Sequence, residues 1–181
     1  ADYDALTMGF QDALFSFGGD WKDANNNATG VINSPEAISA AEFYHDLYAC
    51  CQAPGLSNAF FVEANDAFIG GQVAMAMNYF AFFPALLNPE VNPYGESTGF
   101  FVNPAGPGGD QFAALGGQGM SIISYIAPER QQASMDFIKW FAQEEVQAEW
   151  ARLGGYTCNI NVLQSQEFLD ATPFNPAFAE T

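Results

Sequence analysis

Apolar and polar positions along the chain predict helices joined by short extended segments. The clearest helix begins at Ser34-Pro35-Glu36. Ser34 suits the capping position, Pro35 the first helical position, and Glu36 the positive end of the helix dipole. Apolar or aromatic side chains then recur at residues 38, 41, 44, 47 and 48, the spacing of one helix face. We therefore predict an amphipathic helix from residue 35 to about residue 50.

The same reasoning places the remaining elements. Helices are expected at residues 3–17, 63–69, 80–87, 128–142 and 144–153, and strands at residues 73–77, 99–102 and 120–125. Residues from Gln164 onward are expected to form a loop, because Pro173 and Pro176 prevent a long helix. Helices separate most of the strands, which indicates an α/β fold with short strands and C-terminal helices. A length of 181 residues fits one domain, or one lobe of a larger protein.

The charge of the chain excludes two classes of partner. Twenty-one acidic residues against four basic ones give a formal net charge of −17. Nucleic acid and anionic membrane surfaces are poor partners, because few cations are present to neutralise phosphates. The acidity itself suits either salty surroundings or a secreted protein that avoids polyanions.

The N-terminal residues lack the basic and apolar regions of a signal peptide. Either a signal has been removed or the chain begins inside a longer protein. No apolar run reaches the roughly 18 residues that a membrane-spanning helix needs.

The three cysteines, Cys50, Cys51 and Cys158, allow two readings. Adjacent cysteines rarely pair with each other, so one of Cys50 and Cys51 pairs with Cys158, or all three are buried thiols. No metal site is expected, because the pair lacks Cys-x-x-Cys spacing and His45 is the single histidine.

Motifs for catalysis or cofactor binding are missing from the sequence. There is no Gly-x-Ser-x-Gly, and Gly116-Gly117-Gln118-Gly119 matches neither a dinucleotide-binding nor a phosphate-binding loop. Such a glycine run brings the backbone close either to a ligand or to a neighbouring strand. We expect no cofactor.

Aromatic and polar side chains gather where predicted elements end. They are Asp20-Trp21, Asn78-Tyr79-Phe80, Gln118 and Tyr156. Rings that stack on C–H faces, beside groups that bond hydroxyls, suit a neutral polyhydroxylated ligand. The alternative is that these rings are ordinary core aromatics in an aromatic-rich chain.

Sequence blocks along nearly the whole chain share the order and spacing of one family. They are residues 17–21 (FGGDW), 32–37 (INSPEA), 64–68 (ANDAF), 71–77 (GQVAMAM), 104–109 (PAGPGG), 115–119 (LGGQG), 137–141 (FIKWF), 145–147 (EVQ) and 153–156 (LGGY). In this order they resemble the C-terminal half of an extracellular solute-binding protein of family 1, the sugar-binding component of bacterial ABC importers.

This resemblance implies a non-enzymatic function. It implies that residues 1–181 form the C-terminal portion of a two-lobed protein with a periplasmic-binding-protein-like fold of type II, whose N-terminal lobe is absent or is a partner chain. The whole protein would bind a neutral carbohydrate or polyol in the periplasm or outside the cell and deliver it to a membrane permease. The competing hypothesis is a stand-alone carbohydrate-binding or hydrolytic domain that uses acidic residues, and a third is an inert fragment.

The resemblance also implies a set of ligand-binding residues. These are Asp20, Trp21, Asn78, Tyr79, Phe80, Gly117, Gln118 and Tyr156. Many relatives carry an aromatic residue at the position of Gln118, so a polar ligand group is expected there. Relatives with cysteines at similar places imply a disulfide between Cys158 and either Cys50 or Cys51, which fits an oxidising periplasm.

Overall fold

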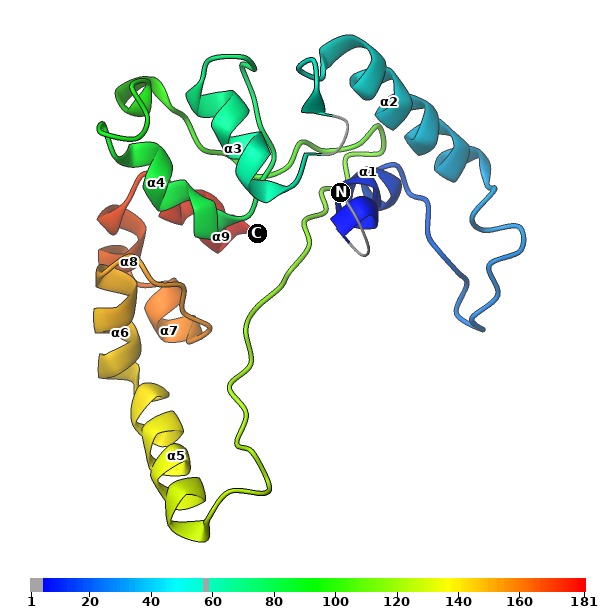
Figure 1. Ribbon diagram of the computed structural model, residues 1–181. Coiled ribbons are helices and arrows are strands. Elements are labelled where there is room, and N and C mark those ends of the chain that lie inside the picture. The colour runs from blue at the N-terminus through cyan, green and yellow to red at the C-terminus, as the bar shows by residue number, and fades with distance from the viewer. Residues whose placement is uncertain (1–4, 57–58) are drawn as a thin grey trace. The chain divides into compact units, whose positions relative to one another are not determined.

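The computed structural model describes residues 5–56 and 59–181 and divides the chain into two compact units (Figure 1). Unit 1 comprises Ala1–Ala114 together with Thr181, and unit 2 comprises Leu115–Glu180. Within the described residues, no helix combines the length and the apolar character needed to cross a membrane.

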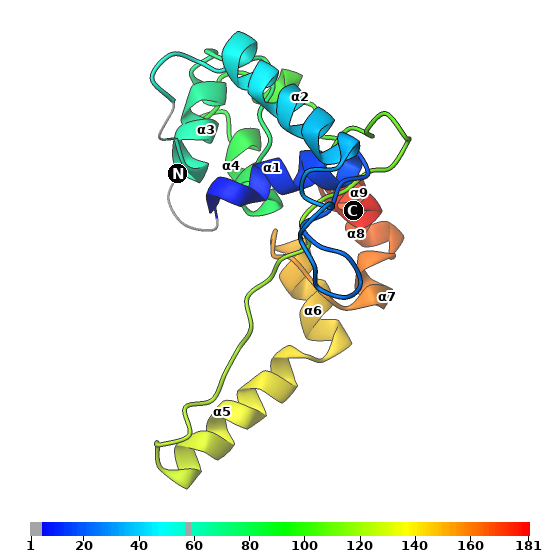
Figure 2. The same ribbon diagram turned by 90° about the vertical axis from the view of Figure 1, so that its right-hand side faces the viewer.

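Unit 1 is built around α1 (Ala5–Ser16) and α2 (Pro35–Cys51), which pack against each other (Figures 1 and 2). Leu14 of α1 is fully buried against Ala37 and Ala40 of α2, with aromatic rings around them. The predicted start of α2 is confirmed, because Ser34 Oγ accepts a hydrogen bond from the Ala37 amide at 3.2 Å. Tyr3 and Asp4, the first residues of the helix predicted at 3–17, lie outside the described residues.

The rest of unit 1 consists of short helices connected by extended chain. They are α3 (Phe61–Ile69), the 3₁₀ turn η2 (Phe80–Phe82), α4 (Phe83–Leu87) and the 3₁₀ turn η3 (Gly95–Ser97). The helices predicted at residues 63–69 and 80–87 are therefore confirmed, and η3 is an additional turn that was not predicted.

The three predicted strands are absent from the described residues, so the α/β part of the prediction is unconfirmed. Residues 73–77, 99–102 and 120–125 contain no strand. Their side chains are often exposed: Met75 retains 75% of its accessible surface and Tyr125 retains 88%. A strand exists only where a neighbour accepts its backbone hydrogen bonds. The apolar runs predicted burial, but no residue of these three segments is buried, because no other segment covers them among the described residues.

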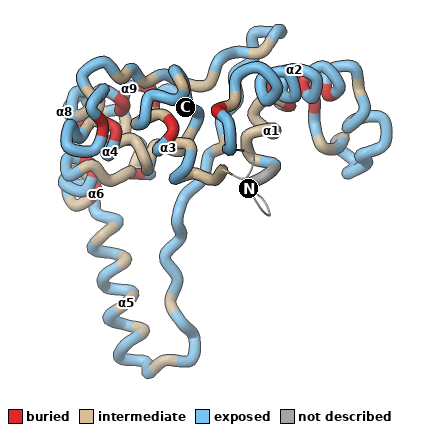
Figure 3. The backbone as a smooth tube through the Cα atoms, turned by 45° about the horizontal axis from the view of Figure 1, so that its top comes forward, coloured by how far each residue is buried: buried red, intermediate tan, exposed pale blue. Residues whose placement is uncertain are grey.

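Unit 2 is helical as well. It contains α5 (Pro128–Phe141), α6 (Glu144–Arg152), α7 (Ile160–Leu163), α8 (Gln166–Ala171) and α9 (Asn175–Glu180). Its core is formed by Ala151, Val162 and Phe168, whereas α5 has no buried residue (Figure 3). The helices predicted at residues 128–142 and 144–153 are confirmed.

The predicted C-terminal loop is wrong, because α8 and α9 follow Gln164. Ser165 Oγ caps α8 by accepting a hydrogen bond from the Phe168 amide at 3.2 Å. Pro176 is the second residue of α9, in the first turn, where a proline breaks no helical hydrogen bond. The prolines limit the length of these helices without preventing them.

Candidate functional site

Five of the eight predicted ligand-binding residues belong to unit 1, and three belong to unit 2. Asp20, Trp21, Asn78, Tyr79 and Phe80 are in the first group; Gly117, Gln118 and Tyr156 are in the second. Each group is described by itself below.

Trp21 is held against α1 by one hydrogen bond and one ring contact. Its indole Nε1 donates to Gln11 Oε1 at 3.2 Å, and its ring meets Phe10 edge to face at 5.7 Å between centroids. The indole is half-buried, so part of the ring surface remains accessible. Two supports on one helix fix both the tilt and the position of the ring.

Asp20 precedes Trp21 and is exposed. Its Oδ1 accepts hydrogen bonds from the backbone amides of Trp21 at 2.6 Å and Lys22 at 3.4 Å. No hydrogen bond to Oδ2 is seen among the described residues, and a carboxylate can accept several.

Tyr79 also contacts α1. Its hydroxyl donates to Met8 Sδ at 2.7 Å, and its ring meets Phe61 edge to face at 5.0 Å. Phe80, the first residue of η2, packs on Phe83 at 4.8 Å between centroids.

Helix α1 thus contacts two of the predicted aromatic residues. Met8 holds Tyr79 and Gln11 holds Trp21, and residues three apart on a helix are neighbours on its surface. Trp21 and Tyr79 are 58 positions apart in the sequence and rest on adjoining parts of the same helix. This polar-aromatic group, made of Met8, Gln11, Asp20, Trp21 and Tyr79, is called the α1 cluster below.

Asp12 gives α1 a partly buried carboxyl group close to the α1 cluster. Burial raises the pKa of Asp12, and a hydrogen bond from Asn103 Nδ2 at 3.2 Å to Oδ2 opposes part of that rise. Burial also raises the pKa of the Tyr44 phenol, and the charge of Asp12 adds to this effect. Asn103 connects α1 to the extended chain, because the same amide nitrogen donates to the Phe112 carbonyl.

Unit 2 presents a different arrangement. Gly117 and Gln118 are exposed in extended chain, and no hydrogen bond links Gln118 to Tyr156 among the described residues. Tyr156 packs on Phe178 at 5.0 Å between ring centroids, and its carbonyl accepts a hydrogen bond from Trp150 Nε1 at 3.1 Å. Its hydroxyl oxygen is buried without a hydrogen-bond partner among the described residues, and burial raises the pKa of this phenol. Such a hydroxyl suits a bound hydroxyl group or a water molecule.

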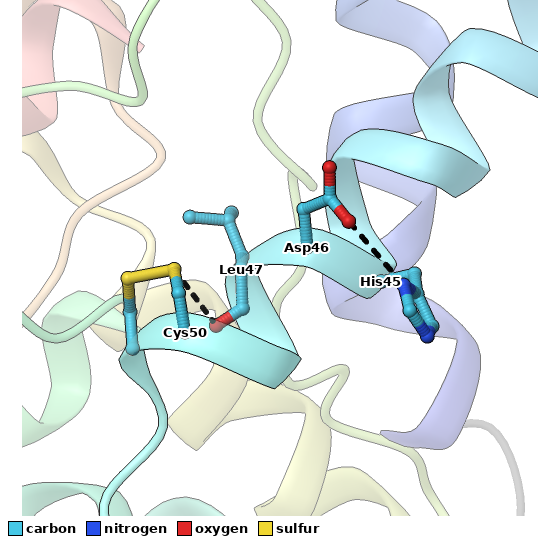
Figure 4. Close-up of a disulfide and its surroundings, with 5 residues drawn as sticks. His45, Asp46, Leu47 and Cys50 are labelled. Carbon is cyan, nitrogen blue, oxygen red and sulfur yellow. Dashed lines mark hydrogen bonds and ion pairs between the residues drawn. A yellow bond between two sulfur atoms is a disulfide. The ribbon is translucent and has the colours of Figure 1, made fainter.

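The expected disulfide of Cys158 with Cys50 or Cys51 is not the one in the structure. Cys50 and Cys51 are bonded to each other at the end of α2, and Cys158 is an exposed free thiol (Figure 4). A bond to Cys158 would depend on long-range packing between distant parts of the chain, which the local sequence does not specify.

His45 lies five residues before Cys50 in α2 and is exposed. Its Nδ1 is 3.4 Å from Asp46 Oδ1 (Figure 4). No group of three or more His, Cys, Asp or Glu side chains among the described residues forms a metal site.

Sequence reasoning missed the residues of α1 that hold Trp21 and Tyr79 in place. Met8, Gln11 and Phe10 read as ordinary positions of an amphipathic helix, because their partners are distant in the chain: Met8 and Tyr79 are 71 positions apart. No local motif distinguishes a supporting amide from a solvated one.

Comparisons with known proteins agree on one family. The model of the bacterial extracellular solute-binding protein family matches residues 3–176. A protein of Deinococcus radiodurans described as a probable ABC transporter-binding protein is 26% identical over 175 residues, which are 96% of this chain and 40% of that protein.

Two solved structures are similar to the chain. The maltose-bound structure of T. maritima MalE3 matches with a TM-score of 0.80 and 29% identity, over 96% of this chain and 44% of that one. The ribitol complex of an ABC transporter solute-binding protein from Agrobacterium radiobacter K84 matches with a TM-score of 0.79 and 22% identity, over 97% and 44%. The chain therefore spans less than half the length of each of these relatives.

Proposed function

The chain belongs to the bacterial extracellular solute-binding protein family, and we propose that it supplies part of the site with which such a protein binds a neutral sugar or polyol. By its description, the family consists of solute-binding proteins and not of enzymes. The α1 cluster is the observation that carries the proposal.

The chemistry of the α1 cluster suits a carbohydrate. Trp21 and Tyr79 offer ring faces and edges to sugar C–H groups, and Asp20 Oδ2 accepts hydrogen bonds from hydroxyl groups. Maltose, which is the ligand of the T. maritima structure, is the first compound to test.

The scarcity of cations favours an uncharged ligand. The chain has four basic residues, of which Lys22 donates to Asn26 Oδ1 and Arg152 pairs with Glu149 at 2.6 Å. A phosphate or carboxylate group on the ligand would find few partners and a strongly acidic surface.

We further propose that the complete protein is exported and delivers its ligand to an ABC permease. The similarity to a probable ABC transporter-binding protein supports this. In this proposal, residues 1–181 form the C-terminal portion of a two-lobed protein whose lobes close on the ligand, and the 40% coverage of that relative is consistent with a partial chain.

The experiment is a ligand screen with product analysis. Maltose, ribitol and other neutral saccharides are compared with glucose 6-phosphate by their effect on the thermal midpoint of the whole protein that contains this chain. We expect a neutral compound to raise the midpoint in a concentration-dependent way and to be recovered unchanged after long incubation. Stabilisation by the phosphate alone would contradict a neutral ligand, and release of product would favour a hydrolytic domain.

A further inference from the structure

Asn78 was expected to contact the ligand, yet its side-chain amide is already occupied within unit 1. Its Nδ2 donates to the Phe61 carbonyl at 2.9 Å and to Asn65 Oδ1 at 2.8 Å. Its Oδ1 accepts from the Tyr79 amide at 2.9 Å. An NH₂ group has two hydrogens, so Asn78 has no donor left for a sugar hydroxyl.

Asn65 is the buried partner in this arrangement. It lies in α3 and retains 7% of its accessible surface. While its Oδ1 accepts from Asn78, its Nδ2 donates to the Phe82 carbonyl at the long distance of 3.5 Å. A buried amide with both ends bonded fixes the groups around it, because an unpaired polar atom there would be costly.

The side chains of Asn65 and Asn78 together link α3 to the chain before and after Tyr79. Asn65 reaches Asn78 before Tyr79 and Phe82 after it, and Phe61 of α3 touches the Tyr79 ring. The position of the phenol ring therefore depends on α3 as well as on Met8 of α1.

We propose that Asn65 is a positioning residue for ligand binding, which acts through Asn78 to hold Tyr79 in place and does not touch the ligand itself. This inference rests on the proposed function, since it assigns Tyr79 to the sugar site. It also reassigns Asn78 from ligand contact to support.

A double-mutant cycle tests the proposal in the whole protein that contains this chain. Maltose affinity is measured by calorimetry for the unaltered protein, Asn65→Leu, Tyr79→Ala and the double variant. Leucine is close to asparagine in size and removes the acceptor for Asn78. We expect Asn65→Leu to weaken binding about threefold to tenfold, and to have no further effect once Tyr79 is alanine.

Asn92→Ala is the matched control. Asn92 is a fully buried amide of the same unit, and its Nδ2 donates to the Leu86 carbonyl at 2.8 Å and to Thr98 Oγ1 at 3.1 Å. We expect this variant to lower the thermal midpoint without changing the affinity. An Asn65 effect that persists in full beside Tyr79→Ala, or an unchanged affinity in Asn65→Leu, would overturn the proposal. If the leucine variant does not fold, Asn65→Ala is measured in its place, with the same expected loss of maltose affinity.

Hydrogen exchange separates failure of this proposal from failure of the proposed function. The Tyr79 amide, which donates to Asn78 Oδ1, is expected to exchange at least about tenfold faster in Asn65→Leu than in the unaltered protein or Asn92→Ala. This readout needs no ligand. Unchanged exchange would overturn the role of Asn65, whereas a protein that shows the faster exchange but binds no neutral sugar would overturn the proposed function alone.

Discussion

Single residues of the α1 cluster have separable roles. The ring of Trp21 is oriented by Gln11 and Phe10 but is only half-buried, so it contributes less to the core than fully buried Leu14. A side chain of this kind is expected to matter more for binding than for folding.

Trp21→Ala should weaken maltose binding by about tenfold or more in the whole protein, because it removes the largest ring face of the cluster. The thermal midpoint should fall only slightly. Calorimetric titration measures the first effect and thermal unfolding the second. Trp140→Ala in α5 is the control, because Trp140 is a tryptophan with half of its surface exposed and lies outside the cluster. Equal affinities in the two variants would remove Trp21 from the site.

Asp12 makes the stability of unit 1 depend on pH. Because burial raises its pKa, the folded state holds the proton more tightly than the unfolded state, and stability falls as pH rises through the acid range. Asp12→Asn removes the partly buried charge that lowers stability at neutral pH. Its side-chain oxygen can still accept the hydrogen bond from Asn103 Nδ2. We expect it to raise the thermal midpoint by about 1–3 °C at pH 7, a small effect because solvent screens a half-exposed carboxyl group, and to give no gain near pH 3.

The control for that experiment is Asp46→Asn, an exposed carboxyl group of α2. Its thermal midpoint should match that of the unaltered protein at both pH values. A midpoint of Asp12→Asn below that of the unaltered protein at pH 7 would show that the carboxylate stabilises the fold.

Among the secondary-structure elements, those with local signals were predictable. Ser34 and Pro35 specify the start of α2 within a few residues of sequence, and Gly18, with φ of +82°, follows the end of α1, where a glycine adopts this conformation without strain. The missing strands and the unexpected α8 and α9 depend instead on partners that the local sequence does not name.

The residues of the candidate site also fall into those that local sequence predicts and those that it does not. Asp20, Trp21 and Tyr79 were predicted because rings and acids at element ends have a recognisable chemistry. Gln11 and Asn65 were not, because a supporting amide is defined only by contacts across the fold.

Peptide mapping determines whether Cys50 is bonded to Cys51 at the end of α2. Trypsin cleaves after Lys22, Arg130, Lys139 and Arg152, so Cys50 and Cys51 lie in peptide 23–130 and Cys158 lies in the peptide that begins at Leu153. After alkylation without reduction, we expect the alkyl group on Cys158 alone and two separate peptides. Reduction before alkylation should modify all three cysteines. A disulfide-linked pair of these peptides would contradict the bond between Cys50 and Cys51.

At the scale of the whole molecule, the chain exposes apolar segments that resemble interior ones. Met75, Leu115 and Tyr125 lie outside the helices and each retain 75% or more of their surface, and α5 has no buried residue. Unpaired backbone and exposed apolar side chains of this kind are usually covered by another segment.

If residues 1–181 are the C-terminal portion of a two-lobed protein, the native protein should be much heavier than 19.6 kDa. Since the chain spans 40–44% of its relatives, an intact mass of more than twice that value is expected for the protein isolated from its source. A native mass of 19.6 kDa would contradict the two-lobed protein. The exposed segments would then be covered by a separate chain, or they would remain exposed.

The most direct test of the sugar site on α1 is a nitrogen-15 NMR titration of the whole protein with maltose, read at the indole N–H groups. The Trp21 and Trp140 signals are each assigned by the signal lost on replacement with phenylalanine. The Trp21 indole, which donates to Gln11, is predicted to shift saturably with maltose while the Trp140 indole stays in place. Saturable maltose binding that leaves the Trp21 signal unmoved would contradict the assignment of the α1 cluster to the ligand.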